Sequence, residues 1–286
     1  MRAGEDVDAG NFNLNFDEDH RLRSAFMRGL MLDHITALPR RPASYTVKVG
    51  TIPRTVVSYW HDPIDLPDDV RACMASWCRL QSEGVALMNF HDLTARSYID
   101  SKYGARARNA FDRCHHPAMR SDYFRLCHVL AEGGVYVDVD DVLVAGDEWR
   151  KLFCGNNLKL QPLCYDLSSH GMLPVPEIWR ADLPATKRIF YVNNNPLAAP
   201  AGHPVLRRAL ERATSKLLST DRALDIQETT GPGNLTACLA AHALELRQAA
   251  KSPDYELLDD WSAIAETRWE LSYRNDARNW RNMDAT

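Results

Sequence analysis

Three aspartates close together are the side chains of this sequence best suited to chemistry. Asp138, Asp140 and Asp141 fall within four consecutive residues of the 286-residue chain. Like charges at this spacing repel one another, and at least one carboxyl should have a raised pKa where water is excluded. A divalent cation would relieve the repulsion, and carboxylate oxygens are the hard ligands that Mg²⁺ or Mn²⁺ prefers. A solvated acidic turn is the alternative interpretation.

The spacing of the first two acids limits how they share an ion. On an extended strand, Asp138 and Asp140 would have Cα atoms about 6.6 Å apart, a wide span for two ligands of one metal. We therefore expect one aspartate to bind the metal directly, and the other to act through water or on a ligand hydroxyl. Because Mg²⁺ and Mn²⁺ keep positions open for phosphate oxygens, a nucleoside-diphosphate sugar is a natural ligand. The metal would neutralise its leaving diphosphate.

The segment before the acids predicts a helix followed by a strand. Pro117 suits the first turn of a helix, and Gly133 and Gly134 suit its end. A stripe of apolar residues at helical spacing makes this helix amphipathic. The stripe consists of Met119, Tyr123, Leu126, Cys127 and Leu130.

Residues 135–140 then alternate with the period of a strand. Val135, Val137 and Val139 should point to one face, and Tyr136, Asp138 and Asp140 to the other. The acids therefore lie at the carboxyl end of a strand, which is where open α/β sheets bind ligands.

Other segments predict the sheet that holds this strand. Residues 51–60 and 85–90 are expected to be strands, and residues 67–80, 93–102 and 105–111 helices. This alternation predicts an α/β fold with a mostly parallel central sheet and flanking helices. We expect a single catalytic domain over residues 46–286, after an N-terminal extension over residues 1–45 that is partly helical. That helix either docks on the domain or binds a partner, and residues 39–42 form the linker.

Composition excludes several classes of protein. The 34 Lys and Arg against 38 Asp and Glu give a formal charge of −4, which argues against nucleic acid as a partner. There is no run of 18 apolar residues to span a membrane and no secretory signal at the N-terminus. The seven cysteines lack a CxxC pair, which favours reduced thiols and a cytoplasmic enzyme. Cys73 and Cys78 have no second cluster with which to bind zinc.

The sequence PAMRSDYFRL…LAEGGVYVDVD resembles the signature of the DXD-motif glycosyltransferases, family 32 in the usual numbering. That group is related to α-mannosyltransferases, capsular polysaccharide transferases and the glucosylating domains of clostridial toxins. The resemblance extends to IPRTVVSYW (52–60), NNNPLAAPAGHP (193–204) and TTGPGNLT (229–236). It implies a GT-A type nucleotide-diphospho-sugar transferase fold.

The resemblance also implies a role for each matching residue. Asp140 would coordinate the metal, and Asp138 would contact the ribose or bind the metal through water. Asp122 and Arg125 would hold hydroxyls of the donor sugar, although an ion pair on the helix surface is the alternative. The implied catalytic residues are thus Asp122, Arg125, Asp138 and Asp140, with Asp138 and Asp140 as metal ligands.

Further residues are implied to line the donor site. Trp60 would lie near the nucleotide base, unless it only packs in the core. Tyr136, Asn194 and Asn195 would face the donor, and a polar loop is the alternative for the two asparagines. Many relatives end in a His-containing segment followed by SerTrp that closes over the donor. Here ETRWELSYR (266–274) has no His, and Ser272 and Tyr273 stand at the place of SerTrp.

The resemblance predicts a metal-dependent glycosyltransferase that uses Mn²⁺ or Mg²⁺ and retains the anomeric configuration. It would move a hexose or N-acetylhexosamine from a nucleoside diphosphate to an acceptor hydroxyl. The acceptor is open among a saccharide, a small molecule and a protein. Two alternatives remain: a non-catalytic module of the same fold that binds a nucleotide sugar or a protein, and a metal-dependent phosphohydrolase.

Overall fold

The computed structural model of the protein describes residues 15–36, 52–220, 222–279 and 281–282. Within these ranges a seven-stranded sheet has the order β2-β1-β3-β7-β5-β6, with β8 paired to β5. Its strands are β1 (Thr55–Tyr59), β2 (Ala86–Phe90), β3 (Gly134–Tyr136), β5 (Leu158–Asp166), β6 (Gly171–Met172), β7 (Arg188–Ala199) and β8 (Tyr255–Leu257). A separate pair joins β4 (Asp141–Leu143) to β9 (Ala265–Thr267).

The sheet is mixed, but most of its strands share one direction. β1 runs parallel to β2 and β3, and β8 runs parallel to β5. β7 lies antiparallel to both β3 and β5, and β6 antiparallel to β5. Five of the seven strands described here, all but β6 and β7, therefore point the same way. The predicted α/β fold with a mostly parallel central sheet and flanking helices is confirmed.

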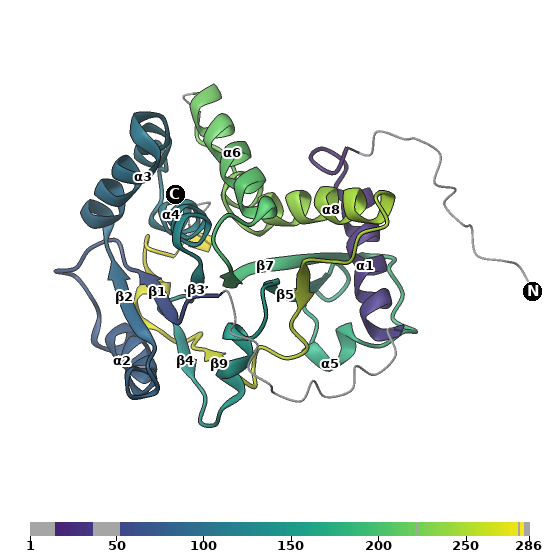
Figure 1. Cartoon of the computed structure of the whole chain (residues 1–286), viewed down its shortest axis with the longest axis horizontal. Helices are drawn as coiled ribbons and strands as arrows, with labels where there is room; N and C mark the ends of the chain where they lie inside the picture. The colour runs from purple at the N-terminus through teal and green to yellow at the C-terminus, as the bar shows by residue number, and fades with distance from the viewer. Residues whose placement is uncertain (1–14, 37–51, 221, 280, 283–286) are drawn as a thin grey trace, which may run out of the picture.

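The two faces of the sheet bury different cores, as the alternation of strand side chains requires. On β1, Val57 and Tyr59 belong to the larger core, whereas Val56 belongs to a smaller core on the opposite face. Helices α3 (Asp92–Asp112), α4 (Pro117–Glu132), α6 (Pro204–Ser219) and α8 (Pro232–Gln248) enclose the larger core (Figure 1). Elements α2 (Asp68–Ser76), η1 (Trp77–Glu83) and η2 (Glu148–Phe153) lie on the other side. The remaining short elements are α5 (Val175–Ile178), α7 (Ile226–Thr229) and η3 (Ser272–Asn275).

The first helix, α1 (His20–Thr36), lies beside β7 and α8, although both elements are far from it in the sequence (Figure 1). Met27, Leu30 and Met31 are buried in the larger core. Of the two predicted alternatives, docking on the domain and binding to a partner, the structure shows the helix docked on the domain. The predicted linker at 39–42 and the boundary between residues 45 and 46 lie outside the described residues, so the division into extension and domain stays a prediction.

Several predicted elements have different limits in the structure. The expected helix over residues 67–80 ends at Ser76 and continues as the tighter turns of η1. The two expected helices over 93–111 form one element, α3, which is interrupted at Gly104 with φ 75°. All seven cysteines are free, in agreement with the predicted reduced thiols. Among the described helices, none has the length and apolar character needed to cross a bilayer.

Candidate active site

The three aspartates follow β3, but not on an extended strand as predicted. β3 ends at Tyr136, and the amide of Val137 makes a last sheet-like bond to the carbonyl of Val57. The chain then turns, so that the amide of Asp141 donates to the carbonyl of Asp138 at 3.2 Å. The period-two pattern thus overestimated the strand. Because the segment is turned, the Cα spacing of an extended chain does not apply to Asp138 and Asp140 here.

Asp138 meets a buried guanidinium from α4. An Nη2 of Arg125 lies 2.9 Å from Oδ1 of Asp138 and 3.1 Å from Oδ1 of Asp122. Arg125 is only 3% exposed and Asp122 7%. The predicted alternative, an ion pair on a helix surface, is wrong because α4 is buried on nearly all sides and is not simply amphipathic. One arginine therefore joins the helix to the turn that carries the acids.

Arg125 is held in place by the elements around it. Its Nη1 donates to the carbonyl of Asn194 at 2.9 Å, and its Nη2 also lies 3.1 Å from the hydroxyl of Ser121. The guanidinium stacks on the ring of Tyr136, 4.3 Å from its centroid. Tyr136 is fully buried, and its hydroxyl is 2.6 Å from Ser121. The ring of Tyr136 thus supports the guanidinium of Arg125, and Tyr136 has no exposed surface that could contact a ligand.

Asp122 lies in a polar recess between three elements. The side-chain amide of Asn194 donates to its Oδ1 at 2.8 Å, and the hydroxyl of Thr230 lies 3.4 Å from its Oδ2. A Cβ on Gly231 would stand 3.3 Å from the same Oδ2, so glycine leaves this oxygen clear. Burial raises the pKa of Asp122 to about 6, against the lowering effect of Arg125. Arg125 itself has a raised pKa because it faces both Asp138 and Asp122.

Asp141 is the most deeply placed of the three acids, with no exposed surface. It accepts hydrogen bonds from the amide of Asn195 at 2.7 Å and the hydroxyl of Thr267 at 2.6 Å. Burial and the neighbouring carboxylates Asp140 and Asp138 raise its pKa well above the usual value. Asn195 in turn accepts the backbone amide of Asp138 at 3.0 Å. Asp141 and Asn195 thus fix the turn, a role that the sequence did not reveal for Asp141.

Asp140 is paired with the C-terminal segment. Its Oδ2 accepts the hydroxyl of Tyr273 at 2.8 Å and forms an ion pair with Arg274. Burial and Asp138 raise the pKa of Asp140, while Arg274 lowers it. The segment at the place of the family's closing segment therefore reaches a DXD acid, through Tyr273 and Arg274.

The acids have the right chemistry for the expected metal. Carboxylate oxygens from Asp138 and Asp140 form a hard donor set of the kind that Mg²⁺ and Mn²⁺ bind. Among the described residues no three His, Cys, Asp or Glu side chains are already grouped around one point. The donor set fits such a metal with two protein ligands, the remaining positions being left to ligand oxygens and water.

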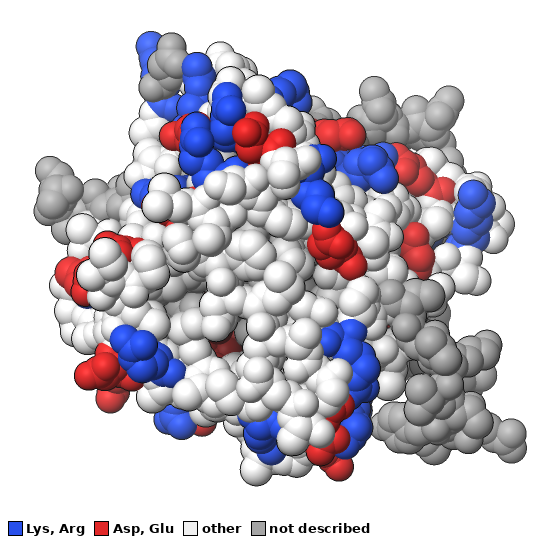
Figure 2. All heavy atoms as spheres, turned by 60° about the vertical axis from the view of Figure 1, so that its left-hand side comes forward, with Lys and Arg blue, Asp and Glu red and all other residues white. Residues whose placement is uncertain are grey.

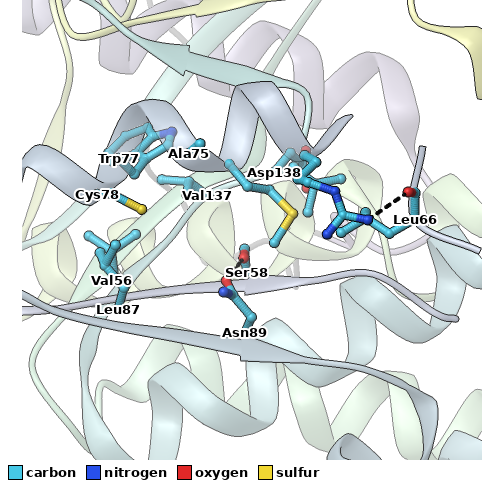
Figure 3. A pocket seen from close by; sticks show the side chains of 13 residues that line it. Val56, Ser58, Leu66, Ala75, Trp77, Cys78, Leu87, Asn89, Val137 and Asp138 are labelled. Atoms are coloured by element: carbon cyan, nitrogen blue, oxygen red, sulfur yellow. Dashed lines mark hydrogen bonds between the residues drawn. The ribbon is translucent and has the colours of Figure 1, made fainter. Parts of the chain in front are cut away.

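A recess of about 250 Å³ opens beside Asp138. Its floor is formed by β1 and β2, where the hydroxyl of Ser58 bonds the side chain of Asn89 at 2.6 Å, and its roof by α2 and η1 (Figure 3). Trp77 and Cys78 line it on the side of the roof (Figure 3). On the face that includes this side of the molecule, charged groups lie at the periphery and acidic atoms are visible in a central hollow (Figure 2). Most side chains that line the recess are apolar, and the polar ones are Ser58, Arg71, Asn89 and Asp138.

Two predicted donor-site residues lie under or on the C-terminal segment. Trp60 is 8% exposed, its indole donates to the carbonyl of Asp65 at 2.9 Å, and it packs edge-on against Tyr273. It does not line the recess. Ser272 is bonded to Asp69 in the first turn of α2, through its amide at 2.6 Å and its hydroxyl at 3.1 Å. Both residues thus anchor the segment in this structure.

The comparison with known proteins agrees with this geometry. Residues 67–150, from α2 to η2, match the family described as "Glycosyltransferase sugar-binding region containing DXD motif". The chain carries a DXD glycosyltransferase region. It is accordingly an enzyme of the glycosyltransferase class. The DXD region includes α4, β3 and the turn with all three acids, but neither Asn194 nor Arg274.

Comparisons over the whole chain are more distant. One solved structure, titled "PaToxG Glycosyltransferase", is 14% identical with a TM-score of 0.45, over 79% of this chain and 80% of that one. No curated protein matches the sequence.

The structure also brings together residues that the sequence did not single out. Arg274, Thr267 and Thr230 each contact an acid of the site. Arg274 lies two residues after Ser272, inside the segment where this chain departs from the family pattern. That departure was the available signal, but only the fold shows that Arg274 reaches Asp140.

Proposed function

We propose that this enzyme moves a hexose or N-acetylhexosamine from a nucleoside diphosphate to an acceptor hydroxyl, with Mn²⁺ or Mg²⁺ and with retention of configuration. The observation that carries the proposal is the chain of ion pairs Asp122–Arg125–Asp138 at the carboxyl end of β3, in which Asp122 and Arg125 are buried and Asp138 is partly exposed. It lies next to a recess that could take a nucleoside. A buried charged network at the edge of a sheet is costly to maintain and is typical of ligand-binding sites.

Each acid has a separate task in this proposal. Asp138 and Asp140 would hold the metal, whose charge stabilises a leaving diphosphate when bound. Asp122 accepts hydrogen bonds from hydroxyls of the donor sugar, and Arg125 keeps it ionised and oriented. Asn194, which donates to Asp122 and accepts from Arg125, positions both side chains. The recess beside Asp138 receives the nucleoside.

The transfer would take place on one face of the sugar. The bond from the anomeric carbon to the phosphate oxygen breaks, and its electron pair leaves with the diphosphate. The acceptor oxygen bonds to the same face of that carbon, and its proton passes to the departing phosphate oxygen. No side chain of the chain need form a covalent intermediate.

The setting of the reaction follows from the side chains and from the fold. Seven free thiols support a reducing compartment, and we place the enzyme in the cytoplasm. The partners would be a nucleotide-sugar donor and a saccharide, small-molecule or protein acceptor. Acceptor sites of such enzymes lie on variable loops.

The test is hydrolysis of nucleotide sugars with and without EDTA, for the wild type, Asp140→Asn and the exposed control Asp147→Asn. We expect chelation to abolish sugar release, and Asp140→Asn to lower kcat/KM about 100-fold, the cost typical of a lost metal ligand or transition-state contact. Asp147, with a side chain 78% exposed, should be replaceable without loss. Activity that ignores EDTA, or full activity of Asp140→Asn, would refute the proposal. Release of inorganic phosphate would identify a phosphohydrolase instead.

A further inference from the structure

A guanidinium lies against one acid of the DXD motif. Arg274 forms an ion pair with Oδ2 of Asp140, and its side chain is 15% exposed. Its guanidinium carbon lies 4.6 Å from the ring centroid of Trp269 and 5.5 Å from that of Tyr273. Contact with two aromatic rings restricts the plane of the guanidinium and lowers the entropy lost when it binds an anion. Arg274 is therefore a pre-positioned cation.

The hydrogen-bonding capacity of Arg274 is not fully used. Its Nε is buried and has no acceptor among the described residues. Its Nη2 donates to Oδ2 of Asp140. A buried donor without an acceptor is costly, and a phosphate would satisfy it because guanidinium groups bind phosphate oxygens in pairs.

The C-terminal segment does not depend on Arg274 for its position. Ser272 is bonded twice to Asp69, and His116 holds the carbonyl of Ala277 at 3.0 Å. Arg278 adds an ion pair with Asp65 at 2.9 Å. A purely structural role for Arg274 would therefore be redundant with three other anchors.

A metal and Arg274 compete for the same carboxylate. A divalent ion on Asp140 and the guanidinium of Arg274 repel each other, so metal binding to this carboxylate must loosen the pair with Arg274. The released guanidinium would remain beside the site, because the two rings and the other anchors keep its backbone in place. A diphosphate held at the metal is the nearest group with matching charge.

We propose that Arg274 is a further catalytic residue of the proposed transferase. Its guanidinium pairs with Asp140 in the free enzyme and moves to the donor's diphosphate when the metal binds. The inference rests on the proposed function, since it needs a diphosphate at the DXD acids. Arg274 then adds a second positive charge to the leaving group. In the absence of metal it also keeps the carboxylate cluster neutralised.

The experiment measures how tightly the full chain binds Mn²⁺ and how tightly it binds a nucleoside diphosphate. Calorimetry follows Mn²⁺ alone, and then UDP, GDP and TDP at saturating Mn²⁺, for the wild type, Arg274→Gln and Arg274→Lys. The matched control is Arg268→Gln, which removes the same charge from the same segment. The side chain of Arg268 is 51% exposed and forms an ion pair with Glu266 at 3.3 Å.

The proposal predicts opposite effects on the two ligands. Without its competitor, Asp140 in Arg274→Gln should bind Mn²⁺ about fivefold more tightly, within the usual range of coupling between sites. The same variant should bind the preferred nucleoside diphosphate about tenfold more weakly, for loss of one charged pair. Arg274→Lys should lie between it and the wild type, and Arg268→Gln should change neither constant.

The outcomes separate this inference from the function on which it rests. If Arg274→Gln binds both ligands more weakly, the residue is only structural. If neither affinity changes, Arg274 has no role in binding; both results overturn the proposal. If the wild type binds none of the three nucleotides with Mn²⁺, the proposed function itself fails. Circular dichroism and the melting temperature of each variant show whether the fold is retained.

Discussion

At the scale of single residues, the site is governed by one guanidinium that serves two carboxylates. Arg125 is within 3.1 Å of both Asp122 and Asp138. Its positive charge is well compensated, so its pKa is raised. Asp122 receives only a share of that charge and is buried, so the effect of burial prevails and raises its pKa to about 6. The energetic cost of the site is thus concentrated on Asp122.

The raised pKa of Asp122 predicts how the free energy of unfolding changes with pH. A carboxyl with a raised pKa in the folded state stabilises the fold when protonated, and that contribution is lost as pH rises through the folded pKa of about 6. Asp122→Asn resembles the protonated acid and does not titrate. The wild type should therefore lose about 1 kcal/mol relative to Asp122→Asn between about pH 5 and pH 7. Urea unfolding of both proteins across this range measures the difference, and a gap that is constant with pH would contradict it.

The types and spacing of the acids could be recognised from the sequence, whereas their partners could not. Asp138 and Asp140 follow a valine-rich strand, and this pattern placed them at the edge of a sheet. Asp122 and Arg125 had the spacing of a surface ion pair, and only the burial of α4 distinguishes the two interpretations. Asn194 lies 69 to 72 positions away from the residues it joins. Local patterns contain no information on contacts of that range.

At the scale of elements, the reversal from α4 into β3 determines where the acids lie. Gly133 and Gly134 both have positive φ, 72° and 99°. A Cβ on Gly133 would stand 2.8 Å from the amide of Ala201 and from Cδ of Pro53. A Cβ on Gly134 would stand 2.9 Å from the carbonyl of Thr55 in β1. Glycine is thus required here both for the backbone angle and for the close approach of β1.

Substitution of these glycines should be far more costly than substitution of glycines elsewhere. We expect Gly133→Ala to destabilise the fold by about 3 kcal/mol or more, because the new methyl group meets the backbone. Gly84→Ala isolates the cost of positive φ, since Gly84 has φ 76° with open space around it, and should cost about 1 kcal/mol. Gly29→Ala within α1 should be neutral or stabilise the protein. Equal effects of all three in denaturant unfolding would show that the close approach has no energetic weight.

The elements themselves were predictable where local signals act alone. Pro117 and the glycine pair bracketed α4 correctly, because both act through their own backbone angles. The strand was expected to continue to Asp140, but the chain turns after Val137, where Asn195 and Asp141 offer hydrogen bonds in place of a strand partner. The alternation of Val and Asp persists through that turn, which is why periodicity alone overestimated the strand.

At the scale of the whole molecule, segments near both ends of the chain pack onto its middle. The C-terminal segment brings Arg274 to Asp140, 134 positions earlier in the sequence. Near the other end, Arg23 of α1 forms an ion pair with Glu228 at 2.6 Å. These contacts join residues that lie far apart in the sequence, and one of them reaches the candidate active site.

The attachment of α1 can be tested through Arg28. Its guanidinium donates to the carbonyls of Ile178, Arg180 and Leu183 at 3.0, 2.7 and 3.1 Å. Arg28→Met would leave these carbonyls without their donor, and we expect a loss of about 2–4 kcal/mol in the free energy of unfolding. Arg21→Met, on the exposed side of the same helix, should change it by less than about 0.5 kcal/mol.

The shape of the unfolding curve decides whether α1 belongs to the main folding unit. Because Met27, Leu30 and Met31 are part of the larger core, Arg28→Met should still unfold in one transition, at a lower urea concentration. Loss of far-ultraviolet ellipticity and loss of tryptophan fluorescence should then coincide. A separate early transition, confined to the helical signal, would show instead that α1 detaches alone and that the extension folds independently of the catalytic domain.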